Sequence, residues 1–242
     1  MKRILTVLLL LLGGMTCHVT AQHHDMHVVM LGDSNTWLGG DDCMTPKGWN
    51  YWMRTLLQPA TCRSYARSGA TWVHTDKMVR DTEENTARLS DNNVITNQIY
   101  RLQEAVAEGK QAVPTLIFIM AGTNDVWFRK DILSTLEHVA VDDVALLQES
   151  FPEARIVLIT PMQNTKVSPE LVREAAEQLE TTAIRMACDL VDASGTEVID
   201  SEQESRKLTF TRDGVHTNEK GAKRLAEFVY MKMSHVKVKS EK

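Results

Sequence analysis

The chain has 242 residues, of which 43% are hydrophobic and 24% charged. This ordinary globular balance favours one domain with a sizeable core. The formal net charge is -5, which argues against a nucleic-acid partner, because nucleic-acid-binding domains usually carry a basic surplus.

The first 21 residues have the pattern of an export signal. Lys2 and Arg3 form a positive start, residues 4–12 form an apolar run, and small residues lead up to Ala21. These are the three parts of a cleavable signal peptide. The run is shorter than the roughly 20 residues that a membrane span needs.

We therefore expect a signal peptide at residues 1–21 and a mature domain at residues 22–242. The sequence before Cys17 is a poor lipidation motif, so we favour loss of Cys17 with the signal over a lipoprotein. The expected mature protein is exported, either to the periplasm or to the medium, with no stable membrane insertion.

Short apolar, β-branched runs alternate with longer segments of helical periodicity. In chain order the pattern predicts a strand at 27–31, a helix at 49–57, a strand at 61–65, a helix through 95–106, a strand at 115–120, a helix at 132–150, a strand at 155–160, a helix that begins at 169, a strand at 190–192 and a last helix after 217. Ser168 is expected to cap the helix at 169, and Thr217 to cap the last one. Alternation of this kind implies right-handed crossovers and a parallel sheet with both faces covered.

Two segments, at 38–48 and 73–93, lack regular patterning. Long irregular segments in a compact domain tend to be functional loops or insertions, and a lid over the substrate is one interpretation. Cys43 and Cys62 flank the helix at 49–57. Export would allow them to form a disulfide, and two buried, reduced thiols are the alternative, since sequence alone does not fix pairing.

Ser34 follows the first predicted strand, within Gly32-Asp33-Ser34-Asn35. Open α/β sheets place their sites at this end of the strands. A serine hydroxyl is a weak nucleophile unless a base takes its proton. His216 is the candidate base, and Asp213, three residues earlier, is placed to orient it.

A carbonyl under attack develops a negative charge on oxygen and needs preorganised donors. Three candidates lie in separate blocks: the backbone of Ser34, the backbone of Gly69 and the side-chain amide of Asn124. Each residue alone has an ordinary alternative as a turn residue. The occurrence of all the blocks in one chain favours the catalytic interpretation.

Trp37 and Trp127 follow Ser34 and Asn124 by three residues each. Their rings are candidates for contact with a sugar or an acyl group, and packing between helices and sheet is the alternative.

Together, these blocks resemble the SGNH subgroup of the GDSL-type esterases and lipases, over nearly all of the mature chain. The resemblance implies a flavodoxin-like, three-layer α/β/α sandwich. It also implies that Ser34 is the nucleophile, that His216 and Asp213 complete a triad, and that Ser34, Gly69 and Asn124 form the oxyanion hole. Asn35 replaces the leucine of the family's name motif, which resembles the carbohydrate esterases of the family, and is a further candidate for substrate contact.

The expected function is that of a serine esterase that removes a small acyl group, such as acetyl, from a carbohydrate or a similar substrate. The alternatives are a lipase, thioesterase or arylesterase with a longer acyl pocket, and an inactive glycan-binding module. We expect neither a metal nor another cofactor.

Overall fold

The computed structural model describes residues 23–73, 94–128 and 133–236. The predicted signal peptide at 1–21 and all but the first residue of the segment at 73–93 lie outside these ranges.

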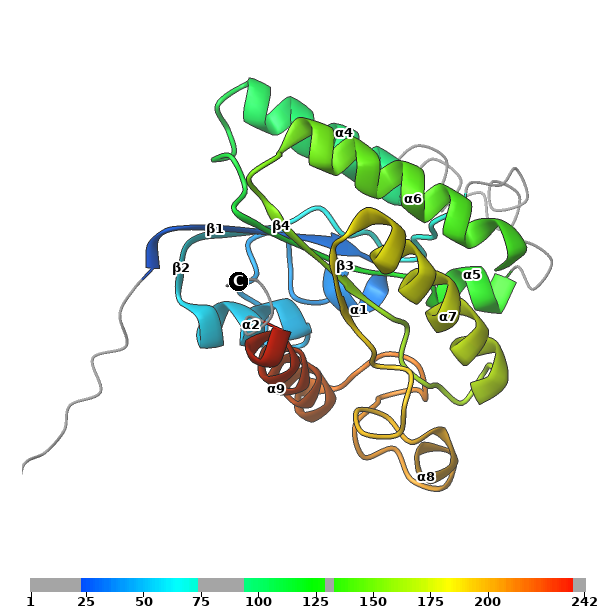
Figure 1. The fold of residues 1–242 in the computed structure, drawn as a ribbon. Coiled ribbons are helices and arrows are strands. Elements are labelled where there is room, and N and C mark those ends of the chain that lie inside the picture. Colours follow the sequence, from blue (N-terminus) through cyan, green and yellow to red (C-terminus); the bar gives the residue numbers. More distant parts are fainter. Residues whose placement is uncertain (1–22, 74–93, 129–132, 237–242) are drawn as a thin grey trace, which may run out of the picture.

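A five-stranded parallel sheet forms the centre of the molecule (Figure 1). Its strands are β1 (His23–Gly32), β2 (Pro59–Ser64), β3 (Leu116–Met120), β4 (Arg155–Ile159) and β5 (Asp189–Val191). The order across the sheet is β2-β1-β3-β4-β5, which is the flavodoxin-like order. The chain therefore reverses its direction of winding between β1 and β3, where such sheets bind their ligands.

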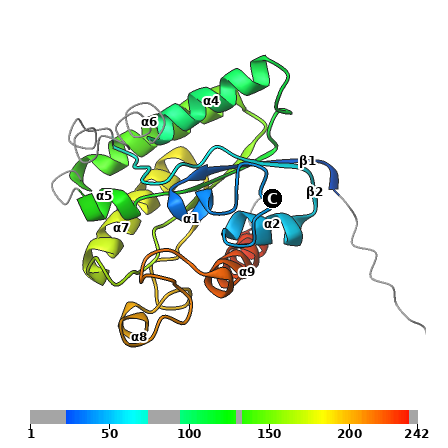
Figure 2. The same ribbon diagram turned by 180° about the vertical axis from the view of Figure 1, so that it is seen from behind.

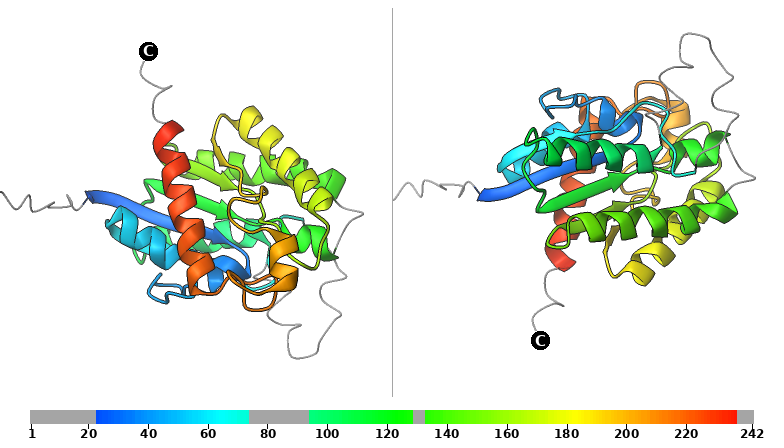
Figure 3. Two further views of the ribbon diagram at one scale, coloured as in Figure 1. Left: turned by 90° about the horizontal axis from the view of Figure 1, so that it is seen from below. Right: turned by 90° about the horizontal axis from the view of Figure 1, so that it is seen from above.

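Helices cover both faces of the sheet. They are α1 (Ser34–Trp37), α2 (Trp49–Leu57), α4 (Ile95–Ala107), α5 (Thr123–Phe128), α6 (Leu133–Ser150), α7 (Pro169–Met186), α8 (Ser201–Arg206) and α9 (Glu219–Val236). Figure 3 shows α9 across one face of the sheet, and α4 and α6 across the other. The view from behind in Figure 2 places α2 beside α9 and α7 on the side of α6. The predicted three-layer α/β/α sandwich is confirmed.

Alternating side chains along the strands explain the two-sided cover. Val28 and Met30 belong to the buried cluster under α2 and α9, whereas Val29 and Leu31 belong to the cluster under α4, α6 and α7. Successive side chains on a strand point to opposite faces, so a sheet that is covered on both sides needs continuous apolar runs.

The longer predicted elements lie within a few residues of the observed ones. The helix at 49–57 has the predicted bounds, and Ser168 caps α7 with its hydroxyl 3.5 Å from the backbone N–H of Leu171. The main difference among the strands is β1, which begins at His23 rather than at residue 27. The short helices α1, α5 and α8 were not predicted, because four to six residues are too few to show a helical period.

The predicted cap of the last helix was wrong by one residue. Asn218 caps α9, where its Oδ1 accepts a hydrogen bond from the N–H of Gly221 at 3.1 Å. The Thr217 hydroxyl instead lies 3.3 Å from Oδ1 of Asn35. Asparagine and threonine are both good caps, so only the tertiary contact of Thr217 distinguishes them.

The disulfide considered for Cys43 and Cys62 is not formed in the structure, where both are free thiols in the same buried cluster. A hydrogen bond with Cys43, together with burial, raises the pKa of the Cys62 thiol.

The segment at 38–48 is ordered by hydrogen bonds between its own turns and to the body of the protein. Its Asp41 carbonyl accepts from the N–H of Ser64, at the end of β2, at 2.8 Å, and its Gly40 carbonyl accepts from the Asn50 amide at 3.3 Å. No helix among the described residues is both long and apolar enough to cross a membrane.

Asp143, on α6, is a buried acid that makes stability depend on pH. Its Oδ1 accepts a 2.7 Å hydrogen bond from the Thr96 hydroxyl on α4. Burial, with a smaller effect from the charge of Asp142, raises the pKa of Asp143 from 3.8 to about 7. Between these two values the folded protein binds more protons than the unfolded chain, so stability falls as pH rises.

We predict that Asp143→Asn stabilises the protein at pH 8 by on the order of 2 kcal/mol, because the amide keeps the Thr96 hydrogen bond and never ionises. At pH 4 the two proteins should differ little, since the folded wild type is protonated there. Urea unfolding at both pH values measures this difference. The control is Glu149→Gln, at an exposed position on the same helix, and an equal gain from Asp143→Asn at pH 4 and pH 8 would contradict this explanation.

Candidate active site

The end of β1 presents Ser34 at the carboxyl edge of the sheet. Asp33 donates its N–H to the Met120 carbonyl at the end of β3. Its carboxylate caps α1 by accepting a hydrogen bond from the N–H of Asn35. Ser34 is therefore the first residue of α1. Gly32 is required just before it, because a Cβ there would lie 2.3 Å from the Met120 carbonyl oxygen.

Gln98, on α4, fixes the same backbone from the side. Its amide oxygen accepts from the N–H of Gly32 at 2.8 Å, and its amide nitrogen donates to the carbonyl of Gly32 at 2.9 Å. Gln98 is fully buried. Gln98 was not predicted from the sequence, because one polar side chain on an amphipathic helix carries no signal of the backbone that it binds.

The turn that contains Gly69 meets the side chain of Asn124 at the carbonyl of Ala70. Gly69 has a φ of 78° in the turn that the N–H of Ala70 closes onto the carbonyl of Arg67, a conformation that favours glycine. The Asn124 amide donates to the carbonyl of Ala70 at 2.8 Å, which leaves its second amide hydrogen for another acceptor. Arg67 donates its N–H to the carbonyl of Gly32, so this turn also lies against the end of β1.

Asp125 ties the loop after Gly69 to α5. Its buried carboxylate accepts from the backbone N–H groups of Trp72 and Val73 at 3.0–3.1 Å. Asn124, the residue before Asp125, is thus held beside this loop by its own hydrogen bond to Ala70 and by those of Asp125 to Trp72 and Val73.

The expected pair of Asp213 and His216 is formed. Nδ1 of His216 lies 2.7 Å from Oδ2 of Asp213, whose Oδ1 accepts from the N–H groups of Val215 and His216. Partial burial raises the pKa of Asp213, but these hydrogen bonds outweigh it and hold the pKa below its ordinary value. Because an ionised carboxylate only accepts, this contact favours the neutral tautomer of His216 with its proton on Nδ1 and a lone pair on Nε2.

Asn35 connects the serine to the histidine. Its Oδ1 accepts from the backbone N–H of Thr217 at 2.9 Å, so the residue after Ser34 is bonded to the residue after His216. Asn35 was expected to contact substrate, but it is only 1% exposed, and its burial argues against direct contact.

Asp33, the residue before Ser34, has a pKa that depends mainly on its burial and partly on the charge of His216. Burial raises the pKa of Asp33 to about 6, against an opposing effect from its hydrogen bond with Asn35 and a smaller one from the charge of His216. Burial also raises the pKa of Asp125 to about 6, and the charge of Asp33 contributes to this rise. Two buried, mutually repelling acids therefore lie under the site.

The two tryptophans lie at the surface. Trp37, at the end of α1, is 46% exposed and Trp127, on α5, is 40% exposed. Packing between helices and sheet does not account for this much exposure. Among the described residues, no group of three or more histidine, cysteine, aspartate or glutamate side chains could hold a metal ion.

A hydroxyl, an imidazole with a carboxylate partner, and amide donors thus lie at the edge where a flavodoxin-like sheet reverses its winding. This combination can transfer an acyl group through a serine ester. The class that fold and site define together is a carboxylic ester hydrolase.

The sequence matches the GDSL-like Lipase/Acylhydrolase family over residues 30–224. The chain belongs to this family, which confirms the resemblance that rests on the blocks around Ser34, Gly69, Asn124 and His216. No curated protein matches the sequence significantly.

Solved structures of low sequence identity share the fold. A member of the lipolytic G-D-S-L family from Veillonella parvula is 20% identical, with a TM-score of 0.57, over 90% of this chain and 100% of its own. The acetyl xylan esterase AlAXEase is 17% identical, with a TM-score of 0.58, over 85% and 98%. A peptidoglycan O-acetylesterase is 15% identical, with a TM-score of 0.52, over 73% of this chain and 46% of its own.

We predict that Asn35→Ala lowers kcat for ester hydrolysis by about tenfold to a hundredfold, because small misplacements of reacting groups have effects of this size. KM should change little, since the side chain is buried. Steady-state kinetics measure both. Thr217→Val is the control, because it keeps the backbone N–H that donates to Asn35 and removes only the hydroxyl; a loss as large as that of Asn35→Ala would contradict this account.

Proposed function

We propose that the protein is an exported serine esterase that removes a small acyl group, such as acetyl, from a carbohydrate. The observation that carries the proposal is the hydrogen bond from Thr217 to Asn35. It brings together the blocks that contain His216 and Ser34, which are far apart in the sequence.

In the proposed reaction, Oγ of Ser34 attacks the ester carbonyl while Nε2 of His216 takes the proton of the Ser34 hydroxyl. Asp213 orients the ring and stabilises the imidazolium. The N–H groups of Ser34 and Gly69 and the amide of Asn124 bind the developing oxyanion. Collapse breaks the bond to the alcohol, which leaves with the proton from His216, and water then hydrolyses the acyl group from Ser34 by the same steps.

Two observations support a small acyl group on a sugar. The exposed rings of Trp37 and Trp127 each lie within three residues of a proposed catalytic residue, and tryptophan rings pack well against sugars. Two structures of similar fold belong to enzymes named for the removal of acetyl groups from glycans. The leader-like residues 1–21 support export, to a compartment where such glycans occur.

We predict that the wild-type protein hydrolyses nitrophenyl acetate and butyrate, that its activity falls with longer chains up to twelve carbons, and that Ser34→Ala lowers kcat by on the order of 10⁴-fold. Nitrophenol release across the series measures this. Ser205→Ala, at an exposed serine on α8, is the control and should be fully active.

Each outcome of this series has a clear meaning. Release of acetate from acetylated xylan by the wild type would extend the result to a glycan. A preference for eight or more carbons would favour the lipase or thioesterase alternative. Full activity of Ser34→Ala would contradict the proposed mechanism, and no turnover of any ester would favour a binding module.

A further inference from the structure

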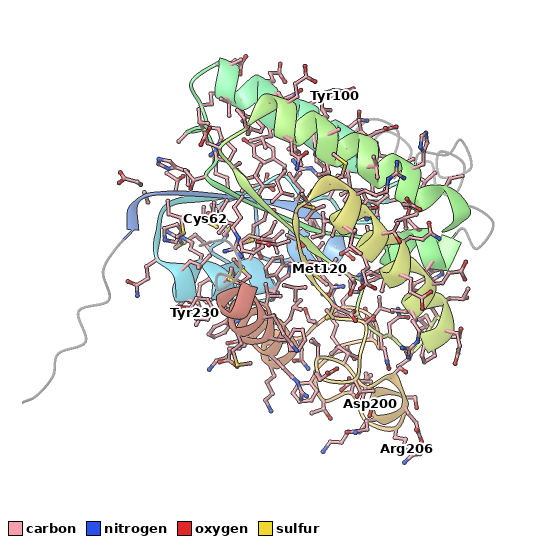
Figure 4. All side chains as sticks on the ribbon, in the orientation of Figure 1. Cys62, Tyr100, Met120, Asp200, Arg206 and Tyr230 are labelled. Atoms are coloured by element: carbon pink, nitrogen blue, oxygen red, sulfur yellow. The ribbon has the colours of Figure 1, made fainter. Side chains whose placement is uncertain are left out.

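The turn that holds Asp213 and His216 has no regular secondary structure of its own. It lies between α8 and α9, in the connection at the lower edge of the molecule in Figure 1. The side-chain view labels Asp200 and Arg206 at the two ends of α8, next to this connection (Figure 4). Besides the hydrogen bonds that Asp213 accepts within the turn, contacts from outside it hold its conformation.

Glu204, on α8, is a buried acid that faces the segment leading into this turn. It is 2% exposed. Its Oε1 accepts from the N–H groups of Thr209 and Phe210 at 3.1 and 2.9 Å. Its Oε2 accepts from the N–H groups of Thr209 and Thr211 at 3.1 Å each, and from the Thr211 hydroxyl at 2.7 Å.

Thr211, which Glu204 binds, also makes contacts with the turn that contains Asp213 and His216. Its hydroxyl oxygen accepts from the N–H of Gly214 at 3.1 Å, and its backbone forms an antiparallel bridge with Thr217. The N–H of Arg212 donates to the carbonyl of His216 at 2.9 Å. Glu204 thus binds Thr211, and Thr211 contacts Gly214 inside the turn and Thr217 just after it.

The opposite side of the same segment is also held. The Asn218 amide donates to the carbonyls of Thr209 and Thr211 at 3.0 and 3.2 Å. The N–H groups of the segment therefore point to Glu204 and its carbonyls to Asn218. Beyond the turn, Thr217 donates to Asn35, as described above.

We propose that Glu204 is a positioning residue of the esterase, which holds the Asp213–His216 pair in register with Ser34 through Thr211. The inference rests on the proposed function, because it requires His216 to be the base. A carboxylate is needed at this position, since each of its oxygens faces at least two donors. In Glu204→Gln, either orientation of the amide turns N–H groups toward N–H groups.

The test compares Glu204→Gln with Glu202→Gln, which changes an exposed carboxylate on the same helix. We expect Glu204→Gln to lower kcat for nitrophenyl acetate by about tenfold or more with little change in KM, because it displaces the base and not the substrate. Glu202→Gln should match the wild type. Equal kcat in the two variants would overturn the proposal.

The pH profile separates positioning from a loss of folded protein. A displaced Asp213 stabilises the imidazolium less, so the acid limb of kcat/KM in Glu204→Gln should move to lower pH, by about 0.5 unit or more. Among the described residues, Arg212, whose Nε lies 3.7 Å from Oδ2 of Asp213, and Asp33, whose carboxyl interacts with the charge of His216, are charged groups near the pair. Glu204→Gln also removes one negative charge, which moves the limb in the same direction. Thr211→Val, described below, changes no charge, so a shift of its acid limb isolates the effect of displacement. A uniform loss at every pH with an unmoved limb would contradict positioning.

Two changes at Thr211 keep the test decisive if Glu204→Gln does not fold. Thr211→Val removes the hydroxyl that joins Glu204 to Gly214 and keeps the shape, so kcat should fall about tenfold. Thr211→Ser retains the hydroxyl and should restore most of the activity. Equal activity of these two variants would overturn the proposal.

His216→Ala distinguishes failure of the inference from failure of the proposed function. If His216→Ala stays active, His216 is not the base and the proposed function is wrong. If His216→Ala is inactive while Glu204→Gln is fully active, only the role of Glu204 is wrong.

Discussion

The arrangement of the site depends on one hydrogen bond between residues that are far apart in the sequence. Oδ1 of Asn35 accepts the N–H of Thr217 across 182 positions of chain. The sheet fixes the first partner, because Gly32 is held between Met120 and Gln98 at the end of β1. Thr217 follows His216 in a connection that belongs to no helix or sheet. This hydrogen bond therefore fixes the segment of the proposed base to α1, which the sheet holds in place.

Buried carboxylates provide much of the remaining order around the site. Asp33 caps the helix that begins with Ser34, Asp125 binds the loop after Gly69, and Glu204 binds the segment before Asp213. Each accepts backbone N–H groups that neither helix nor sheet can satisfy. The raised pKa values of Asp33 and Asp125, about 6 in both cases, show that their ionised forms are costly at neutral pH. The protein thus gives up some stability to fix irregular loops at its functional edge.

The sequence predicts the layers of the fold and the chemical groups of the site, but not the contacts that align them. The apolar runs of β1 and β3 and the stripes of α2 and α7 are long enough to show their periods. Ser34, Asp213 and His216 are recognisable because their chemistry is specific and their blocks resemble a known family.

Gln98 and Glu204 carry no comparable signal. Each is one of several polar residues on its helix, and only the tertiary structure shows which backbone it meets. The predicted cap at Thr217 was wrong for the same reason, because that side chain is used in a contact between distant segments.

The most direct measurement of the proposed mechanism is labelling with a fluorophosphonate, followed by peptide mass mapping. We predict one adduct, on the Ser34 oxygen with loss of fluoride, which is absent in Ser34→Ala and much slower to form in His216→Ala. An adduct on a different residue of the active enzyme, or equally rapid labelling in His216→Ala, would contradict it.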